Sequence, residues 1–147
     1  MLACAADYRI MAQQAGRIGV PELLVGVPFP TIALEIMRCV AAPEQFQALL
    51  YSGATLEPED AMGRGLVDAI VEPGKLLEQA VAKAESLAAL PAAAFELTKR
   101  QVHEPMMKRV HEEGPRFDAI VEALWAGPTA QAAIRDYVAR TFKRSQK

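Results

Sequence analysis

One carboxylate in this sequence has surroundings that suit acid–base chemistry. Glu22 lies in the stretch 16–26, between glycines and apolar residues, with no Lys or Asp within four positions. A carboxylate that loses water in apolar company has a raised pKa, and a pKa near neutrality suits a group that takes up and returns protons. The same local sequence also fits an exposed turn glutamate, because glutamate is rarely buried in folded proteins.

The other side chains that could bind a metal or act as a nucleophile do not have the spacing of a known site. His103 and His111 stand eight positions apart with Pro105 between them, and no third ligand is spaced to complete a metal site. Cys4 and Cys39 match no metal spacing, and we expect both to be small buried side chains in a reducing compartment. No serine has a nucleophile-elbow setting and no glycine-rich phosphate loop is present. The sequence therefore predicts no metal site.

Composition narrows the class of protein. A chain of 147 residues, 52% of them hydrophobic, is long enough for one domain with a real core. The net charge is -2 and the two signs are mixed along the chain, so the sequence lacks the excess of basic residues that is typical of nucleic-acid-binding proteins. No apolar run approaches the ~20 residues of a membrane span, and no basic segment of a secretory signal precedes the first apolar residues. We expect a cytoplasmic protein, with no nucleic-acid or membrane partner, whose first residues belong to a folded element.

The start of the chain predicts short extended segments. Residues 2–6 are good helix formers and fit the end of a helix. Strands are expected over 7–12 and 17–20, where aromatic and β-branched residues gather before polar or breaking residues. Two prolines in the stretch 26–31 keep the residues before them out of the α region, so this stretch is expected to be an extended loop.

The next segments alternate helix and strand. Thr31 is the expected N-cap of a helix over 32–41, and Pro43 opens a second helix that Gly53 stops. A third helix is expected to start within 55–61, with Thr55 or Glu57 near its cap, and a strand to follow over 66–71.

The second half of the sequence is almost entirely helical. Apolar residues at steps of three and four predict an amphipathic helix over 75–90. The further elements are a helix from Pro91 to 103, a break or kink at Glu104-Pro105, a short piece over 106–112, a break at Gly114-Pro115, a helix with Phe117 to Trp125, a last helix capped by Thr129 and a frayed basic tail over 143–147. We therefore divide the chain into an α/β part, 1–74, and a helical part, 75–147.

Two motifs carry a resemblance to a known family. The first is ACAADYRI (residues 3–10) followed by GVPELLVG (19–26), and the second is LYSGATL (50–56) followed by AMGRGLVD (61–68). Together they resemble the crotonase (enoyl-CoA hydratase/isomerase) superfamily. The resemblance spans nearly the whole chain but only the C-terminal portion of a full family member. It implies an α/β fold class: the end of a ββα spiral core followed by a helical trimerisation region.

The resemblance also implies chemistry on acyl-CoA thioesters. Family members hold the thioester oxygen with two backbone N–H groups, stabilise an enolate and move protons with a glutamate. Glu22 matches the second catalytic glutamate, and no cofactor is implied beyond the CoA of the substrate. Both oxyanion-hole segments of the family lie ahead of Met1, which itself falls where hydratases carry their first glutamate. A single glutamate favours isomerase-type chemistry. The alternative is a non-catalytic remnant or oligomerisation module, and we expect no turnover of a short enoyl-CoA by the isolated chain.

Five further residues are implied as substrate contacts. Pro21 directly precedes the glutamate, and Leu24 follows it by two positions. Phe29 either narrows the acyl site or packs in the core. Lys99 either meets the CoA phosphates or lies on a solvated helix face, and Tyr137 matches an aromatic residue near a neighbouring subunit's acyl pocket, with core or interface packing as the alternative. The family resemblance further implies a homo-trimer or hexamer.

Overall fold

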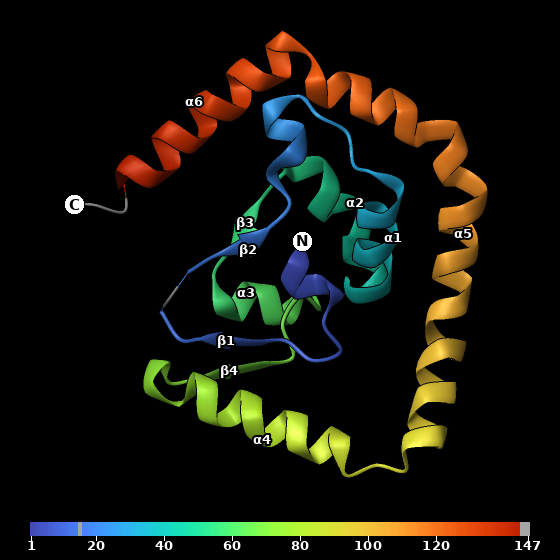
Figure 1. The fold of residues 1–147 in the computed structure, drawn as a ribbon. Coiled ribbons are helices and arrows are strands. Elements are labelled where there is room, and N and C mark those ends of the chain that lie inside the picture. Colours follow the sequence, from blue (N-terminus) through green and yellow to red (C-terminus); the bar gives the residue numbers. More distant parts are fainter. Residues whose placement is uncertain (15, 145–147) are drawn as a thin grey trace.

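The structure is a computed structural model that describes residues 1–14 and 16–144, and the side chains of residues 1–14 and 16–141. It is an α/β fold in which helices predominate (Figure 1). In chain order the elements are η1 (Leu2–Ala5), β1 (Ile10–Ala12), β2 (Ile18–Gly19), η2 (Pro21–Val25), α1 (Thr31–Val40), α2 (Pro43–Ser52), β3 (Thr55–Leu56), α3 (Pro58–Gly63), β4 (Ala69–Val71), η3 (Pro73–Lys75), α4 (Leu76–Ala88), α5 (Ala92–Ala126) and α6 (Pro128–Arg144), where η denotes a 3₁₀ helix. The predicted division at residue 74 falls within η3, and the predicted frayed tail lies partly outside the described residues.

The strands form two separate pairs. β1 runs parallel to β4, with Ile10 opposite Ala69, and β2 runs antiparallel to β3. The predicted strands 7–12 and 66–71 are therefore shorter than expected, because only their last residues pair. The expected helix start within 55–61 is confirmed, because α3 begins at Pro58 with Glu57 as its N-cap. Thr55, the other residue expected near the cap, lies instead in β3, which pairs with β2.

A bidentate ion pair fixes the start of the parallel pair. The Asp68 carboxylate accepts hydrogen bonds from Nε of Arg9 at 2.7 Å and from Nη2 at 2.8 Å, and the Arg9 backbone N–H adds a third at 2.8 Å. Burial by itself would raise the pKa of Asp68, but these hydrogen bonds and the nearby positive charges hold that pKa below its ordinary value. The ladder between β1 and β4 is thus anchored at one end by side chains.

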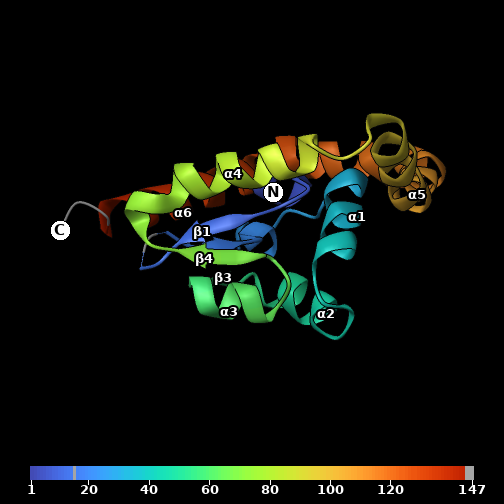
Figure 2. The same cartoon turned by 90° about the horizontal axis from the view of Figure 1, so that it is seen from below.

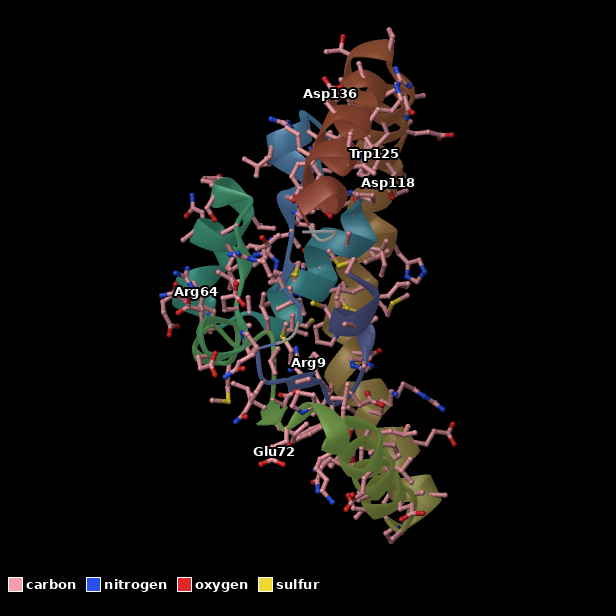
Figure 3. All side chains as sticks on the ribbon, turned by 90° about the vertical axis from the view of Figure 1, so that its left-hand side faces the viewer. Arg9, Arg64, Glu72, Asp118, Trp125 and Asp136 are labelled. Carbon is pink, nitrogen blue, oxygen red and sulfur yellow. The ribbon has the colours of Figure 1, made fainter. Side chains whose placement is uncertain are left out.

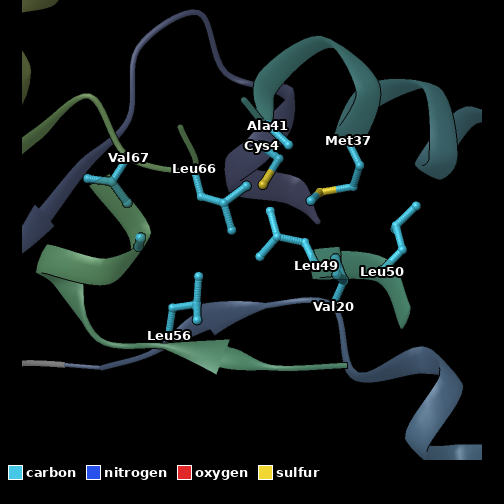
Figure 4. Close-up of a cluster of buried hydrophobic side chains, with 10 residues drawn as sticks. Cys4, Val20, Met37, Ala41, Leu49, Leu50, Leu56, Leu66 and Val67 are labelled. Carbon is cyan, nitrogen blue, oxygen red and sulfur yellow. The ribbon is translucent and has the colours of Figure 1, made fainter. Parts of the chain in front are cut away.

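The main core lies between η1, the helices α1 to α3 and the β2–β3 pair. Figure 4 shows its side chains meeting from these elements, with Met37, Leu49 and Leu66 fully buried. The predicted inward residues of α2 are confirmed, since Leu49 and Leu50 belong to this core and Phe46 packs against it. Burying a side chain of this size contributes about 1.5–3 kcal/mol, so this cluster is a principal source of the fold's stability.

The two cysteines differ in exposure. Cys4 is buried in the main core, as predicted, but Cys39 is exposed and the prediction for it was wrong. Cys39 follows the fully buried Met37 on α1 by two positions, which places it about 200° around the helix axis from that residue. Residue type indicates burial only on average, whereas the face of the helix decides it.

A distant side chain caps helix α1. Thr31 was expected to be the N-cap, but it is the first residue of the helix, and its hydroxyl donates to the Asp118 carboxylate at 2.8 Å. The Thr31 backbone N–H donates to the same carboxylate oxygen, also at 2.8 Å. Asp118 lies 87 positions away on α5, and its carboxylate accepts the hydrogen bond from the helix N-terminus that an N-cap side chain usually accepts.

Helix α5 runs uninterrupted through two prolines. Breaks were expected at Pro105 and at Gly114-Pro115, yet both prolines lie inside the helix. Both are exposed, so the carbonyl groups that lose a donor can turn to water. Figure 1 shows the helix changing direction along its length. Bonds from Arg109 to Glu35 and from Asp118 to Thr31 tie it to α1, so tertiary contacts override the local helix breakers.

The helices α4, α5 and α6 frame the remaining elements. In Figure 1 they enclose the α/β part on three sides, and Figure 2 shows α4 on one face of the β1–β4 pair with α3 on the other. The predicted helix over 75–90 is confirmed as α4, although none of its residues is buried. The last helix begins at Pro128, one residue before the predicted cap Thr129.

Two kinds of feature are absent from the described residues. No helix in this part of the chain combines the length and the apolar character that crossing a membrane requires. Within the same residues, no group of three or more His, Cys, Asp or Glu side chains is placed to hold a metal ion.

Candidate active site around Glu22

Glu22 sits in the single turn η2, whose ends are fixed by its sequence. Pro21 occupies the first position of the turn, where its missing N–H costs nothing. Gly26 ends it with φ 74°, a left-handed conformation that glycine adopts without strain. The Val27 backbone N–H donates to the Glu22 carbonyl at 3.1 Å, and both Val20 and Val27 are fully buried. The buried valines thus hold the turn from either side.

The Glu22 carboxyl group is half-buried and lacks a full set of partners. Its Oε2 atom is buried and accepts no hydrogen bond from any described residue. Loss of hydration on burial raises the pKa of Glu22 above its ordinary value, and the hydrogen bond from its own backbone N–H opposes this shift only in part. The predicted alternative of an ordinary exposed turn glutamate therefore does not hold. A carboxyl group with a raised pKa and a free buried oxygen is suited to taking and giving a proton.

The raised pKa of Glu22 predicts a pH-dependent penalty on stability. The folded state holds this proton more tightly than the unfolded chain, so stability falls as pH rises from the unfolded pKa to the folded one. We expect Glu22→Gln to increase the free energy of unfolding at pH 7 and to have less effect at pH 4. Urea unfolding of both proteins at the two pH values measures this. An equal gain at both pH values would contradict the assignment.

Three long-range hydrogen bonds hold the loop that follows Glu22. The indole N–H of Trp125 donates to the carbonyl oxygen of Pro28 at 2.8 Å, and Asp118 holds Thr31 as described above. Figure 3 shows Asp118 and Trp125 near each other at one end of the molecule. The C-terminal part of α5 therefore holds the middle of the segment that leads from η2 into α1, at Pro28, and the start of α1, at Thr31.

A small buried cluster adds to this anchoring. Val25 and Val27 pack with Ala130 of α6, and Trp125, Ala133, Ile134 and Tyr137 cover the cluster. In Figure 1 the η2 turn lies under the corner at which α5 passes into α6. The position of Glu22 thus depends on contacts with residues about a hundred positions further along the chain.

Loss of the Asp118 cap is expected to weaken this anchoring. Asp118→Ala leaves the Thr31 N–H and hydroxyl without their acceptor, which should lower the free energy of unfolding by about 1–2 kcal/mol. Asp118→Asn retains an acceptor oxygen and should cost less. Chemical denaturation provides the measurement, with Asp136→Ala on the exposed part of α6 as the matched control. A cost for Asp118→Ala no larger than that of the control would refute the capping role.

The structure places the predicted substrate contacts other than Lys99 either in η2 or in the two hydrophobic clusters. Pro21 precedes Glu22 directly. Leu24 is largely exposed and lies over Gly53, where an added Cβ would stand 2.6 Å from its Cγ. Tyr137 packs in the cluster beneath η2, and Phe29 packs against the main core. For Phe29 and Tyr137 these contacts match the packing alternatives that the sequence left open.

Lys99 lies elsewhere. It pairs with Asp7 and lines a cavity of about 300 Å³ together with Thr98 and His103. Trp125 follows Lys99 on α5 by 26 positions, which corresponds to about 39 Å of helix. The cavity that contains Lys99 does not include Glu22 among its lining residues, so the structure does not bring these two predicted residues together.

Asp118 and Trp125 were not predicted as residues of the site. Trp125 was expected on an apolar helix face, and its indole N–H, which needs an acceptor when buried, was the one available signal. Asp118 carried no signal in the sequence, since a carboxylate on a helix is usually solvated. Only the packing of α5 against α1 reveals its partner.

Comparisons with known proteins bear on this geometry. The model of the Enoyl-CoA hydratase/isomerase family matches residues 1–138. The chain is similar to carboxymethylproline synthase from Pectobacterium carotovorum subsp. carotovorum, with 26% identity over 136 residues that cover 92% of this chain and 54% of the relative. A putative enoyl-CoA hydratase from Thermus thermophilus is 35% identical over 98 residues, covering 67% of this chain and 38% of the relative.

A solved structure has a similar fold. The crystal structure of human mitochondrial delta3-delta2-enoyl-CoA isomerase matches with a TM-score of 0.83, covering 97% of this chain and 56% of that one, at 21% identity. At this identity the match shows the fold alone. The synthase and the isomerase match most of this chain, and this chain spans about half the length of each. The names of the three relatives describe three different reactions.

Proposed function

Because the chain belongs to the enoyl-CoA hydratase/isomerase family, we propose that it contributes the general acid/base, Glu22, to proton transfer on acyl-CoA thioesters. The observation that carries this proposal is the half-buried Glu22 carboxyl group, with its raised pKa and its unpartnered buried oxygen. A raised pKa makes the ionised carboxylate a stronger proton acceptor, which suits a group that takes a proton from a substrate and returns it.

The proposed reaction is the movement of a double bond. The Glu22 carboxylate removes a proton from the α carbon of a 3-enoyl thioester, and the electrons of that C–H bond delocalise into the thioester oxygen as a dienolate. The protonated carboxyl group then returns the proton at the γ carbon, which gives the 2-enoyl thioester with no change in composition. One carboxylate suffices for this shuttle, whereas hydration must also position a water molecule. No cofactor is needed beyond the CoA that the substrate carries.

The thioester oxygen needs its own stabilisation. In the family resemblance, two backbone N–H groups from segments ahead of Met1 supply it, and one such donor is typically worth about 100- to 1,000-fold in rate. We therefore assign to this chain the proton-transfer part of the site and expect no detectable turnover of a short enoyl-CoA by the isolated 147 residues.

The decisive experiment measures the exchange of acyl-CoA protons with solvent and compares the protein that has Glu22 with its Glu22→Gln variant. A fusion places the part of the Pectobacterium protein that this chain does not match ahead of Met1, and the uptake of deuterium from D₂O into an acyl-CoA is followed by mass spectrometry. Exchange that depends on Glu22 supports the proposal. A folded fusion whose exchange is the same with Gln at this position contradicts it.

A second reading, a non-catalytic oligomerisation module, is favoured by one observation. Large apolar side chains stand exposed along α5 and α6: Leu97, Val102, Met107, Phe117, Ile120, Leu124 and Val138. Exposed apolar surface of this extent often marks an interface. We propose that this surface mediates a homo-trimer or hexamer, which light scattering of the purified chain tests directly. A monomer at all concentrations would remove this reading.

We also propose that the protein works in the cytoplasm. Cys4 and Cys39 are both free thiols, and Cys39 is exposed, which suits a reducing compartment. Two of the named relatives carry enoyl-CoA in their names, so we propose fatty acid metabolism as the context of this chain.

A further inference from the structure

The loop between Glu22 and helix α1 has few backbone donors of its own. Its residues 26–30 include Pro28 and Pro30, which have no backbone N–H. The Val27 N–H donates to the Glu22 carbonyl and closes the η2 turn, but neither proline can continue this pattern. The carbonyl groups beyond Val27 therefore depend on donors from other parts of the chain.

Trp125 supplies such a donor. It is the only tryptophan of the chain, and its indole N–H donates to the carbonyl oxygen of Pro28 at 2.8 Å. The same side chain packs against the small cluster that contains Val25 and Val27, so Trp125 contacts the loop through both its ring and its N–H group. A partly buried tryptophan usually finds an acceptor for its N–H, and here the acceptor belongs to the segment that follows Glu22.

The donor is itself held at the corner between α5 and α6. Trp125 lies in the last turn of α5, and its carbonyl accepts a hydrogen bond at 2.9 Å from the side-chain amide of Gln131 on α6. The Gly127 N–H donates to the Leu124 carbonyl at 3.3 Å, and the Gln131 N–H donates to the Gly127 carbonyl at 3.0 Å. Figure 1 shows this corner above the η2 turn. The indole N–H is thus presented to the loop from a corner that several hydrogen bonds hold in place.

The hydrogen bond from Trp125 acts close to Glu22. Pro28 directly follows Val27, which is fully buried and donates to the Glu22 carbonyl at 3.1 Å. A movement of Pro28 would therefore carry Val27 with it and loosen the turn at Glu22. Asp118 binds Thr31, three residues beyond Pro28, so Trp125 is the nearer of these two anchors to Glu22 along the loop.

We propose that Trp125 is a positioning residue for the proton transfer assigned to Glu22: its indole N–H holds the Pro28 carbonyl and thereby fixes the turn from which the Glu22 carboxyl group reaches the acyl carbon. This inference rests on the proposed function of Glu22. Trp125 acts through the backbone of the loop and takes no part in the bonds that form and break. A misplacement of about 1 Å caused far from the chemistry can lower a rate by about 100-fold.

The first test introduces Trp125→Phe into the fusion described above. Phenylalanine keeps an aromatic ring against Val25 and Val27 but has no N–H to donate. Deuterium exchange into the acyl-CoA at saturating substrate is expected to slow by about 10- to 100-fold. The half-saturating concentration should be unchanged, because the substitution alters the position of Glu22 and leaves substrate binding intact.

The pH profile separates a positioning role from a general loss of stability. A loosened turn admits water to the buried Oε2 atom of Glu22, so the inflection in the exchange rate should move down toward the ordinary pKa range of a glutamate. Tyr51→Phe is the matched control, since it also removes a polar hydrogen from an aromatic side chain, on an exposed part of α2. This control should leave both the rate and the inflection unchanged.

A further measurement needs no activity. In the 147-residue chain, Trp125→Phe should accelerate hydrogen exchange of the Val27 amide at least about tenfold, because the loop opens more often without its anchor. The Leu66 amide, which donates to the Ala61 carbonyl in the main core, should exchange as before. Gln131→Met removes an exposed side chain that supports the Trp125 carbonyl, so it should cause a smaller change in the same direction. This variant tests the anchor again if Trp125→Phe does not fold.

Three outcomes overturn the proposal. The first is a fusion whose exchange depends on Glu22 but keeps its rate and its inflection with Trp125→Phe. The second is a rise in the half-saturating concentration alone, which assigns Trp125 to substrate binding. The third is Val27 exchange that is unchanged in both variants or that accelerates equally at Leu66, which leaves Trp125 with a general role in stability. A rate that is the same with Glu22→Gln contradicts the proposed function instead, and the Val27 measurement then still decides whether Trp125 anchors the turn.

Discussion

Replacing Glu22 by glutamine is expected to slow deuterium exchange into an acyl-CoA by about 100- to 10,000-fold, the usual contribution of a positioned general acid/base. Glutamine keeps the size of the side chain but cannot accept a proton at neutral pH. The assay uses the fusion described above, which supplies the backbone donors that the family resemblance places ahead of Met1. Because glutamine fits the same space, binding of the CoA ester should be unchanged, so the loss should fall on the rate at saturating substrate.

The pH profile of exchange adds a second readout to this test. With Glu22 in place, the rate should rise with pH through an inflection above the ordinary range of a glutamate, because burial raises the pKa of this carboxyl group. The Gln variant should lack this inflection. Glu44→Gln, on the exposed first turn of α2, serves as the control and should leave the rate unchanged. A Gln variant of Glu22 that keeps both rate and inflection would remove Glu22 from the chemistry.

Arg109→Met is expected to lower the free energy of unfolding at pH 7 by about 2 kcal/mol, less than the 3–5 kcal/mol of a fully buried pair because Arg109 is partly exposed. Glu35 on α1 is only 4% exposed, and its carboxylate accepts hydrogen bonds from Arg38 at 3.0 Å and from Arg109. Without Arg109, a buried carboxylate keeps one cation only, and the bond that ties α5 to α1 is lost.

The cost of Arg109→Met should shrink as the pH falls. Burial by itself would raise the pKa of Glu35, but the hydrogen bonds from Arg109 and Arg38 outweigh it and hold that pKa below its ordinary value. A lowered folded pKa gives stability that is present above the unfolded pKa and is lost as the pH falls through the folded one. Urea unfolding from pH 7 down to about pH 3 measures this dependence, because the loss begins only below the unfolded pKa.

A double variant separates the charge from the packing. Adding Glu35→Gln to Arg109→Met removes the poorly paired carboxylate and should recover part of the loss, which a double-mutant cycle quantifies. Arg116→Met, which breaks an exposed pair with Glu113, should cost at most about 0.5 kcal/mol. Equal costs for Arg109→Met and Arg116→Met would show that the buried pair adds no stability.

Local sequence predicted the features that depend on near neighbours. The helices over 32–41, 43–53 and 75–90 appear as α1, α2 and α4, because their breakers and apolar spacing act within a few residues. The turn around Glu22 also follows from local chemistry, since Pro21 opens it and Gly26 can adopt the φ of 74° that ends it. The family resemblance rested on the same local motifs and is confirmed over residues 1–138.

Long-range contacts determined the parts of the fold that local sequence did not predict. The pairing of Thr55 and Leu56 with β2 could not be predicted from a stretch that reads as a helix start. The continuity of α5 through Pro105 and Pro115 depends on its bonds to α1, which outweigh the local preference for a break. In each case the free energy that selects the conformation comes from residues far away in the sequence.

Local sequence likewise determines some properties of the Glu22 site, and long-range contacts determine the others. The sequence by itself determined that a carboxylate stands among apolar residues in a proline-opened turn, because residue types and spacing fix that much. Only the tertiary structure decided that Glu22 is half-buried with an unpartnered oxygen, that Trp125 and Asp118 hold the following loop, and that Lys99 lies elsewhere. Burial and hydrogen-bond partners depend on how α5 and α6 fold back over the turn, and sequence spacing does not record that path.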